Sequence, residues 1–312
     1  MSVRELSPEL AKVAKDELGE EPARIPADLL AIKVWLEKQT YIIARTDDQW
    51  LIAFLRGCKY SLERTKEKLD NYYSMKSFFP EINLAFNPMD AKMQALLNAG
   101  VILVLPKPCS PSGPRVLLLR PGCIDNKEYT ILDCMLLNNM IIDMLLLDDD
   151  HTAVAGTHMI VDMKGSSLSF FSYFTQMSPA TMKKLFTSSQ DAVPVRQKGG
   201  HHINTPPGVE TLFNLIKSFM NEKLQKRLFV HNQDMEALYK YVPKDVMPAE
   251  YGGNGGTLSE ITEQTKAMME RRRDFFLENV NFKTDESKRP GKPRTLETSD
   301  SIEGSFRQLN VD

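Results

Sequence analysis

The 312-residue sequence has few of the features that mark metal or nucleic-acid sites. Its four cysteines, Cys58, Cys109, Cys123 and Cys134, form no C-x-x-C pair, and no cysteine–histidine spacing suits zinc. We therefore expect reduced cysteines, an intracellular protein and no metal. The net charge is −2, from 39 Lys and Arg against 41 Asp and Glu. This balance excludes a global attraction to nucleic acid, so a site for a polyanion would be a local patch.

The sequence also lacks the common catalytic motifs. No G-x-G-x-x-G follows a predicted strand, and there is no G-x-x-x-x-G-K-[ST] loop to cradle phosphates. The G-x-S-x-G turn that presents a nucleophilic serine is missing as well. These absences predict a protein that is not an enzyme and that uses no cofactor.

Long hydrophobic runs are scarce too. The N-terminus is charged from Arg4 onward, unlike a secretory signal. The most apolar window, Ile131–Leu147, is interrupted by Asp133, Asn138, Asn139 and Asp143. It is also shorter than the roughly 20 residues that a membrane span needs. We expect a cytoplasmic protein.

Two polar clusters require interpretation. Asp148-Asp149-Asp150-His151 follows the apolar window, and a solvated loop is favoured there over a cation site. His201-His202 lies in a predicted strand, where neighbouring side chains point to opposite faces. The two histidines are therefore not expected to share a metal ion.

Three zones of composition organise the chain. Residues 1–90 have the pattern of short helices with polar links, which predicts a helical bundle. Residues 91–256 alternate predicted strands and helices, which is typical of an α/β layer with a mostly parallel or mixed sheet. A helical segment over residues 257–282 follows. The tail, residues 283–312, has few aromatics and many charged residues, so we expect it to be disordered. The elements predicted in the middle zone are strands over Val101–Leu105, Val116–Leu119, Val154–Met163, Gly200–Asn204 and Leu228–His231, and helices over Ile131–Leu147, Pro179–Ser189 and Val209–Met220.

The predicted helix over Ile131–Leu147 is apolar on nearly every side, which indicates burial on most of its surface. Asn139 and Asp143 are four residues apart and share one face of it. The pair is either a hydrogen-bonded polar stripe on a core helix or a polar handle inside an apolar cavity.

Residues 183–227 form a local basic segment with eight positive and three negative side chains. Apolar residues from Val209 to Met220 follow one helical face, and Lys223 and Arg227 continue it. Apolar residues followed by basic ones suit docking on an anionic membrane. A solvated helix end is the alternative, because cations near a helix C-terminus are favourable anyway.

Four spaced segments together resemble the CRAL-TRIO lipid-transfer family, on the branch of the tocopherol transfer and retinaldehyde-binding proteins. Asp47–Tyr60 resembles its N-terminal helical motif, and Ile160–Gly165 its central strand. Gln190–Arg196, with His202-Ile203-Asn204 and Pro206, is similar to the next βα unit. Tyr241-Val242-Pro243 with Pro248–Gly253 is similar to the closing segment. The resemblance covers about residues 5–280.

The resemblance implies an N-terminal helical bundle followed by an α/β lipid-binding domain, whose single hydrophobic ligand lies in a cavity closed by a mobile lid helix. The implied cavity residues are Leu136, Asn139, Met140, Asp143, Thr157, Val161, Phe170, Phe174, Ser189 and Val195. The implied lid residues are Val209, Leu212, Phe213, Leu215 and Ile216. Arg196, Lys198, Lys223 and Arg227 match positions that bind a phosphoinositide headgroup.

The sequence departs from the family at three places. The stretch Ser166–Met177 is longer than in the tocopherol-binding relative, which weakens the match of Phe170 and Phe174 to cavity positions. Lys217-Ser218-Phe219-Met220 stands where relatives have Lys-Pro-Phe-Leu, so no proline enforces the end of the lid helix. Asn139 and Asp143 replace small hydroxyl side chains of the tocopherol-binding relative, which indicates a different polar end on the ligand.

The expected function is to carry a small hydrophobic lipid of the retinoid, tocopherol or carotenoid type, released at phosphoinositide-containing membranes. We expect a cytoplasmic protein that associates peripherally with membranes. One alternative is transfer or sensing of phosphatidylinositol itself. Another is a membrane-trafficking adaptor whose tail, residues 283–312, recruits a partner.

Overall fold

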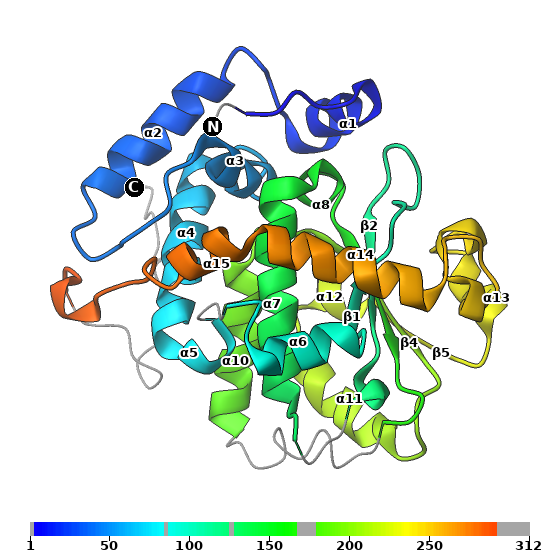
Figure 1. Cartoon of the computed structure of the whole chain (residues 1–312). Helices are drawn as coiled ribbons and strands as arrows, with labels where there is room; N and C mark the ends of the chain where they lie inside the picture. The colour runs from blue at the N-terminus through cyan, green and yellow to red at the C-terminus, as the bar shows by residue number, and fades with distance from the viewer. Residues whose placement is uncertain (1–2, 84–86, 125–127, 167–178, 292–312) are drawn as a thin grey trace, which may run out of the picture.

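The computed structural model describes residues 3–83, 87–124, 128–166 and 179–291. It combines helices at the N-terminal end with a five-stranded mixed sheet that has helices on both faces (Figure 1). The predicted α/β class and the predicted N-terminal helices are both confirmed. No helix in these ranges is long and apolar enough to cross a membrane.

The N-terminal part is helical up to residue 98. Ser7 caps its first helix by accepting a hydrogen bond from the Leu10 amide at 3.3 Å, and Pro8 occupies the first turn. Its elements are α1 (Pro8–Val13), η1 (Ala14–Leu18), α2 (Ile25–Glu37), α3 (Asp48–Gly57), α4 (Leu62–Phe78), α5 (Pro80–Asn83) and α6 (Ala91–Asn98).

The five strands lie in sequence order in the sheet. They are β1 (Ile102–Val104), β2 (Arg115–Leu119), β3 (Thr157–Asp162), β4 (Gln197–Ile203) and β5 (Leu228–Asn232). The β1–β2 pair is antiparallel and the other three pairs are parallel. Parallel neighbours need long crossovers, and helices supply them. The crossover helices are α7 (Ile131–Asp148), α8 (Asp150–Val154), α10 (Pro179–Ala192), α11 (Val209–Ser218) and α12 (Glu222–Gln225).

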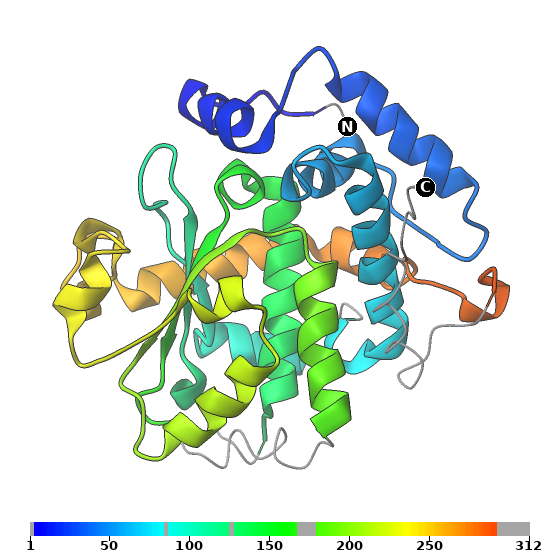
Figure 2. The ribbon, with the colours of Figure 1, turned by 180° about the vertical axis from the view of Figure 1, so that it is seen from behind.

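Different helices cover the two faces of the sheet. The C-terminal helices α13 (Met235–Tyr239) and α14 (Leu258–Arg271) cover one face, where Ile160 and Ile203 pack against Leu238 and Ile261. Seen from behind, α7 and α10 lie together on the other side, with α10 beside α4 (Figure 2). The helical segment predicted over residues 257–282 is interrupted at Arg272, after which α15 (Arg273–Asn279) begins.

One continuous core joins the N-terminal helices to α7. It contains Trp50 and Phe54 of α3, Leu69 of α4 and Ile141 of α7, all with no exposed surface. Gly57, at the end of α3, approaches the segment before β4 so closely that an added Cβ would overlap the carbonyl oxygen of Pro194. The two parts of the chain therefore pack as one body around shared apolar side chains.

Residues 283–291, predicted to belong to the tail, lie against the N-terminal helices. The Ile43 amide donates to the Lys283 carbonyl at 2.9 Å, and the Asp285 amide donates to the Tyr41 carbonyl at 2.7 Å. Arg289 donates to both carboxylate oxygens of Asp70, at 2.9 and 2.8 Å. Residues 283–291 are therefore held against the N-terminal helices rather than disordered, and the rest of the predicted tail lies outside the described residues.

Candidate functional site

A small cavity lies where α4, α5, α7 and the end of α10 meet. Its volume of about 20 Å³ is room for about one water molecule. Leu136, Asn139, Met140 and Asp143, all predicted cavity residues, are part of its wall. The remaining lining residues are Tyr72, Met75, Lys76, Ile82, Ile142, Ala192 and Val193.

Helix α7 supplies the central wall of this cavity. Its first turn is set by a capping box, in which the Thr130 amide donates to Oδ2 of Asp133 at 2.8 Å. Thirteen of its 18 residues are buried, as the apolar sequence predicts. Because α7 is buried on nearly all sides, its polar residues must find partners on other elements.

Both polar residues of the α7 stripe have such partners. Asn139 donates from Nδ2 to the Ile82 carbonyl at 2.8 Å. Oδ2 of Asp143 accepts from the Tyr72 hydroxyl at 2.7 Å and from Nδ2 of Asn279 at 3.0 Å. The stripe is therefore hydrogen-bonded and lines the cavity, so the two interpretations of the sequence are not exclusive.

The polar corner of the cavity contains two buried side chains of opposite charge. Burial raises the pKa of Asp143, and nearby Lys76 opposes that change. Burial lowers the pKa of Lys76 to about 8, with Asp143 opposing it. Nζ of Lys76 donates to the Asn279 carbonyl at 3.4 Å and lies 5.0 Å from the centre of the Tyr72 ring.

Tyr72 and Lys76 were not predicted from the sequence. They belong to α4, more than 50 residues before α7, and no local motif identifies them as cavity residues. Their spacing of four does place them on one helical face. Which face of α4 meets α7 depends on tertiary packing, so only the fold reveals their role.

Three other predicted cavity residues, Thr157, Val161 and Val195, are described and do not line this cavity. Thr157 is buried at the start of β3, and Val161 is half-buried beneath α11. Val195 is half-buried against the main core. Ser189 lies in α10, but its side chain is not among those that the structure describes. Phe170 and Phe174 lie outside the described residues.

The predicted lid is helix α11, whose apolar side packs against the sheet. Val209 and Phe213 are buried against Val161 and Met163. The Phe213 ring meets the His202 ring edge-on, with centroids 4.6 Å apart. The helix predicted over Val209–Met220 ends two residues earlier, at Ser218.

The remaining lid residues vary in exposure. Leu215 is 37% exposed and Ile216 is half-buried. The side chain of Leu212 is not among those that the structure describes. The contact of α11 with the sheet is therefore carried by its N-terminal half.

The predicted phosphoinositide residues gather around the N-terminal ends of β4 and β5. Nη1 of Arg196 lies 2.8 Å from Oε2 of Glu17, and Nζ of Lys198 lies 3.4 Å from the same oxygen. Arg227 donates to the Gln197 carbonyl. The Glu17 carboxylate in η1 thus already pairs with two of the four predicted residues, Arg196 and Lys198.

A fifth basic residue, Lys59, joins this patch and was not among the predicted residues. Burial and the positive charges of Arg227, Lys59 and Arg196 lower the pKa of Lys223. Lys59 follows α3 in a left-handed turn, with φ of 53°. Lys59 lies within the Asp47–Tyr60 motif, and this position was the feature of the sequence that could have indicated its role.

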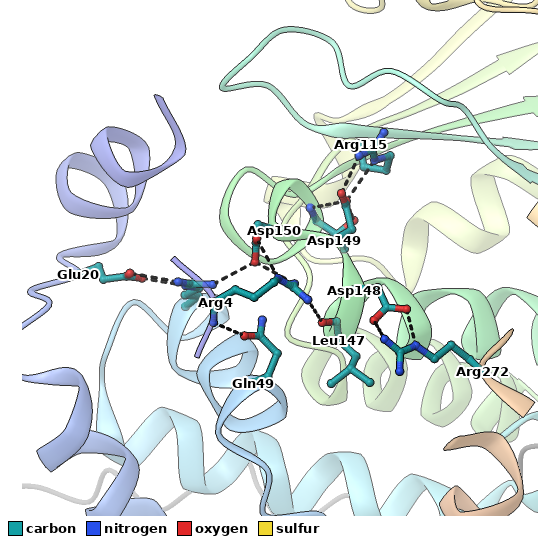
Figure 3. Close-up of polar contacts among 11 residues, drawn as sticks. Arg4, Glu20, Gln49, Arg115, Leu147, Asp148, Asp149, Asp150 and Arg272 are labelled. Atoms are coloured by element: carbon teal, nitrogen blue, oxygen red, sulfur yellow. Dashed lines mark hydrogen bonds and ion pairs between the residues drawn. The ribbon is translucent and has the colours of Figure 1, made fainter. Parts of the chain in front are cut away.

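The prediction of a solvated loop for the acidic run is wrong. Oδ2 of Asp148 accepts from Nε of Arg272 at 2.7 Å (Figure 3). Asp149 accepts from Nε and Nη2 of Arg115 at 3.1 and 2.6 Å. Asp148 therefore ties the end of α7 to the turn between α14 and α15, and Asp149 ties the turn after α7 to β2.

Asp150 completes this arrangement at the N-terminal helices. Nη2 of Arg4 donates to it at 3.1 Å, and Nη1 of Arg56 lies 3.7 Å away. Arg56 is 1% exposed and binds Glu20 with two hydrogen bonds, at 2.8 and 3.1 Å. Arginines on separate elements form ion pairs with Asp148, Asp149 and Asp150, so the acidic run is not a solvated loop.

The two adjacent histidines point to opposite faces of β4, as predicted. The ring of His201 lies within hydrogen-bond distance of His158 at 2.9 Å and of His231 at 3.0 Å. His202 instead contacts the predicted lid through Phe213. Among the described residues, no three His, Cys, Asp or Glu side chains are placed to hold a metal ion.

Known proteins resemble both parts of this arrangement. A family model described as the CRAL/TRIO domain matches residues 99–253, and one described as Pinta-like, UBA domain matches residues 21–93. Alpha-tocopherol transfer protein-like from Mus musculus is 31% identical over 274 residues, which cover 88% of this chain and 78% of the relative. Clavesin-2 from Rattus norvegicus is 25% identical over 250 residues, covering 80% and 75%. The crystal structure of Sfh5 aligns with a TM-score of 0.48 at 14% identity, covering 88% of this chain and 99% of that one.

The relationship to the mouse relative extends over most of both chains, and the matched models account for the helical part and the sheet separately. The resemblance inferred from the four sequence segments is thereby confirmed. The chain belongs to the CRAL-TRIO family of lipid-binding proteins.

Proposed function

We propose that this protein is a cytoplasmic carrier that binds one small hydrophobic lipid of the retinoid, tocopherol or carotenoid type and releases it at phosphoinositide-containing membranes. The observation that carries the proposal is the cavity beside α7, whose wall includes four of the predicted ligand residues. The name of the mouse relative, alpha-tocopherol transfer protein-like, supports the same class of cargo.

Binding such a lipid requires the cavity to expand. A volume of about 20 Å³ is far smaller than the roughly 300 Å³ or more of typical ligand pockets. Met75 and Met140 line the cavity, and their unbranched side chains can repack with little strain. Apolar burial of the ligand contributes about 25 cal/mol per Å², which offsets the cost of opening.

Release at membranes is the second part of the proposal. The basic patch, defined as Lys59, Arg196, Lys198, Lys223 and Arg227, includes residues before and after the predicted lid α11. An anionic headgroup would compete with Glu17 for Arg196 and Lys198. A membrane that binds the open form better than the closed form shifts the equilibrium toward opening.

The proposal is tested by mass spectrometry of organic extracts from the purified full chain, after incubation with total tissue lipid. One enriched apolar lipid, near one per protein, is the expected result. Enrichment of phosphatidylinositol alone would instead support transfer or sensing of that lipid. A folded protein that retains no lipid would overturn the carrier function and direct attention to the adaptor alternative.

A further inference from the structure

We infer that the ammonium group of Lys76 binds the polar end of the lipid, and that this end is an uncharged oxygen acceptor, a hydroxyl or a carbonyl. The inference rests on the proposed carrier function and specifies the ligand. It begins from the position of Lys76, which is 2% exposed and lines the cavity between α4 and α7.

Lys76 has donor capacity that the described structure does not use. An ammonium group has three N–H donors. Among the described residues, Nζ makes one hydrogen bond, to the Asn279 carbonyl at 3.4 Å, and otherwise lies over the Tyr72 ring. A buried ammonium with one long hydrogen bond gains substantially from a further oxygen acceptor.

Asp143, in contrast, already accepts two hydrogen bonds, both at Oδ2. Its Oδ2 accepts from Tyr72 and from Asn279, on α4 and α15. These bonds come from two helices outside α7, so they hold the polar corner in place while the apolar walls adjust. Lys76 is the group of this corner that has unused N–H donors, and these require an oxygen acceptor on the ligand.

The charges around Lys76 decide between a neutral and an acidic ligand. Asp143 on α7 provides one negative charge, and Arg45 provides a positive one that Asp47 and Glu278 balance at 3.2 and 2.7 Å. With Lys76 itself, these groups carry two positive and three negative charges, so the corner has no surplus positive charge to offer an anionic ligand. A ligand carboxylate would bring a second buried negative charge beside Asp143, which is unfavourable, whereas a hydroxyl or carbonyl adds none.

The test uses three retinoids that differ only at the polar end: retinol, retinoic acid and deoxyretinol, the matching hydrocarbon. Their dissociation constants are measured by ligand fluorescence with the wild-type full chain and with Lys76→Met, Lys76→Gln and Met75→Leu. Met75→Leu is the matched control, because Met75 also lines the cavity from α4 but carries no donor. Thermal unfolding followed by circular dichroism shows that each variant is folded.

We expect wild type to bind retinol roughly tenfold more tightly than deoxyretinol or retinoic acid, as one charge-assisted hydrogen bond predicts. Lys76→Met should reduce the preference over deoxyretinol to less than about twofold, and Lys76→Gln, which keeps an N–H donor, should restore part of it. Met75→Leu should change the affinities for retinol and deoxyretinol together and keep their ratio.

A preference for retinol that persists in Lys76→Met overturns the inference and leaves the carrier function intact. Tightest binding of retinoic acid by wild type overturns it as well. So does failure to bind any of the three retinoids by a protein that does retain an extracted lipid. If the extraction also yields no lipid, the proposed function itself fails.

Discussion

The Tyr72 hydroxyl on α4 donates a hydrogen bond to Oδ2 of Asp143 on α7 at 2.7 Å. Tyr72 is 6% exposed and Asp143 is 8% exposed, so the bond lies inside the protein. It joins the N-terminal helices to the helix that flanks the sheet, across 71 positions of sequence. This single contact couples the packing of the two parts to the polar corner of the cavity.

Replacement of Tyr72 by Phe tests the strength of this bond. The ring remains, but the buried carboxylate loses one of its two donors to Oδ2. We expect the free energy of unfolding to fall by about 1–3 kcal/mol, measured by urea denaturation. Tyr241→Phe is the control, because Tyr241 is 42% exposed and should change stability by less than about 0.5 kcal/mol. Equal effects of the two variants would contradict the assigned role of the bond.

The stability of the protein should depend on pH through Lys76. Burial lowers its pKa from 10.5 to about 8, so between these values the unfolded chain holds a proton that the folded protein has lost. Stability therefore rises with pH in this interval. We expect the free energy of unfolding of wild type to increase relative to Lys76→Met between pH 8 and pH 10.5.

The charged and titratable groups around Lys76 affect its pKa and therefore this expectation. Asp143 opposes the lowered pKa of Lys76, and Arg45 reinforces it. Burial keeps the pKa of Tyr72 well above 10, so that hydroxyl stays neutral. Lys66→Met, also on α4, is the control, and its difference from wild type should not follow the same interval. A constant difference between wild type and Lys76→Met would show that Lys76 does not titrate there.

Reversal of charge in the basic patch should slow transfer to anionic vesicles. In Lys223→Glu combined with Arg227→Glu, two attractive groups become repulsive. At about 1 kcal/mol per basic residue, we expect transfer to phosphoinositide-containing vesicles to fall by roughly tenfold or more. Transfer to vesicles of neutral phosphatidylcholine should be unchanged. Fluorescence dequenching of a labelled lipid measures both rates.

The matched control is Lys107→Glu combined with Lys240→Glu, two exposed lysines outside the patch. It alters the net charge by the same amount. Because Arg227 also donates to the Gln197 carbonyl, thermal unfolding must show that the patch variant is folded. A similar loss of transfer in both double variants would mean that net charge, and not the patch, governs the rate.

Gly57→Ala should destabilise the protein although it improves helix propensity. An added Cβ would overlap the carbonyl oxygen of Pro194, so α3 and the segment before β4 would have to separate. We expect a loss of about 1–3 kcal/mol in the free energy of unfolding, as for other overpacked sites. Gly200→Ala is the control, because the nearest atom to its added Cβ, Nε2 of Gln197, lies 3.4 Å away. Stability equal to wild type in Gly57→Ala would contradict the close approach.

The amino-acid sequence by itself determined the features that depend on local pattern. The apolar surface of Ile131–Leu147 required burial on nearly all sides, and the structure buries it. Ser7 and Pro8 specified the start of α1. The alternation of strands and helices, with the spaced family segments, identified the class of fold. Each of these depends on residues close together in the chain.

Only the tertiary structure decided the partners of the polar side chains. Asp148, Asp149 and Asp150 are consecutive, yet their arginines come from 124, 34 and 146 positions away. Tyr72 and Lys76 line the cavity because α4 packs against α7 with the helical face that carries them. The periodicity of the sequence does not specify which face of α4 meets α7. A buried charge is stable only when a distant group meets it, and the folding of the whole chain determines which group that is.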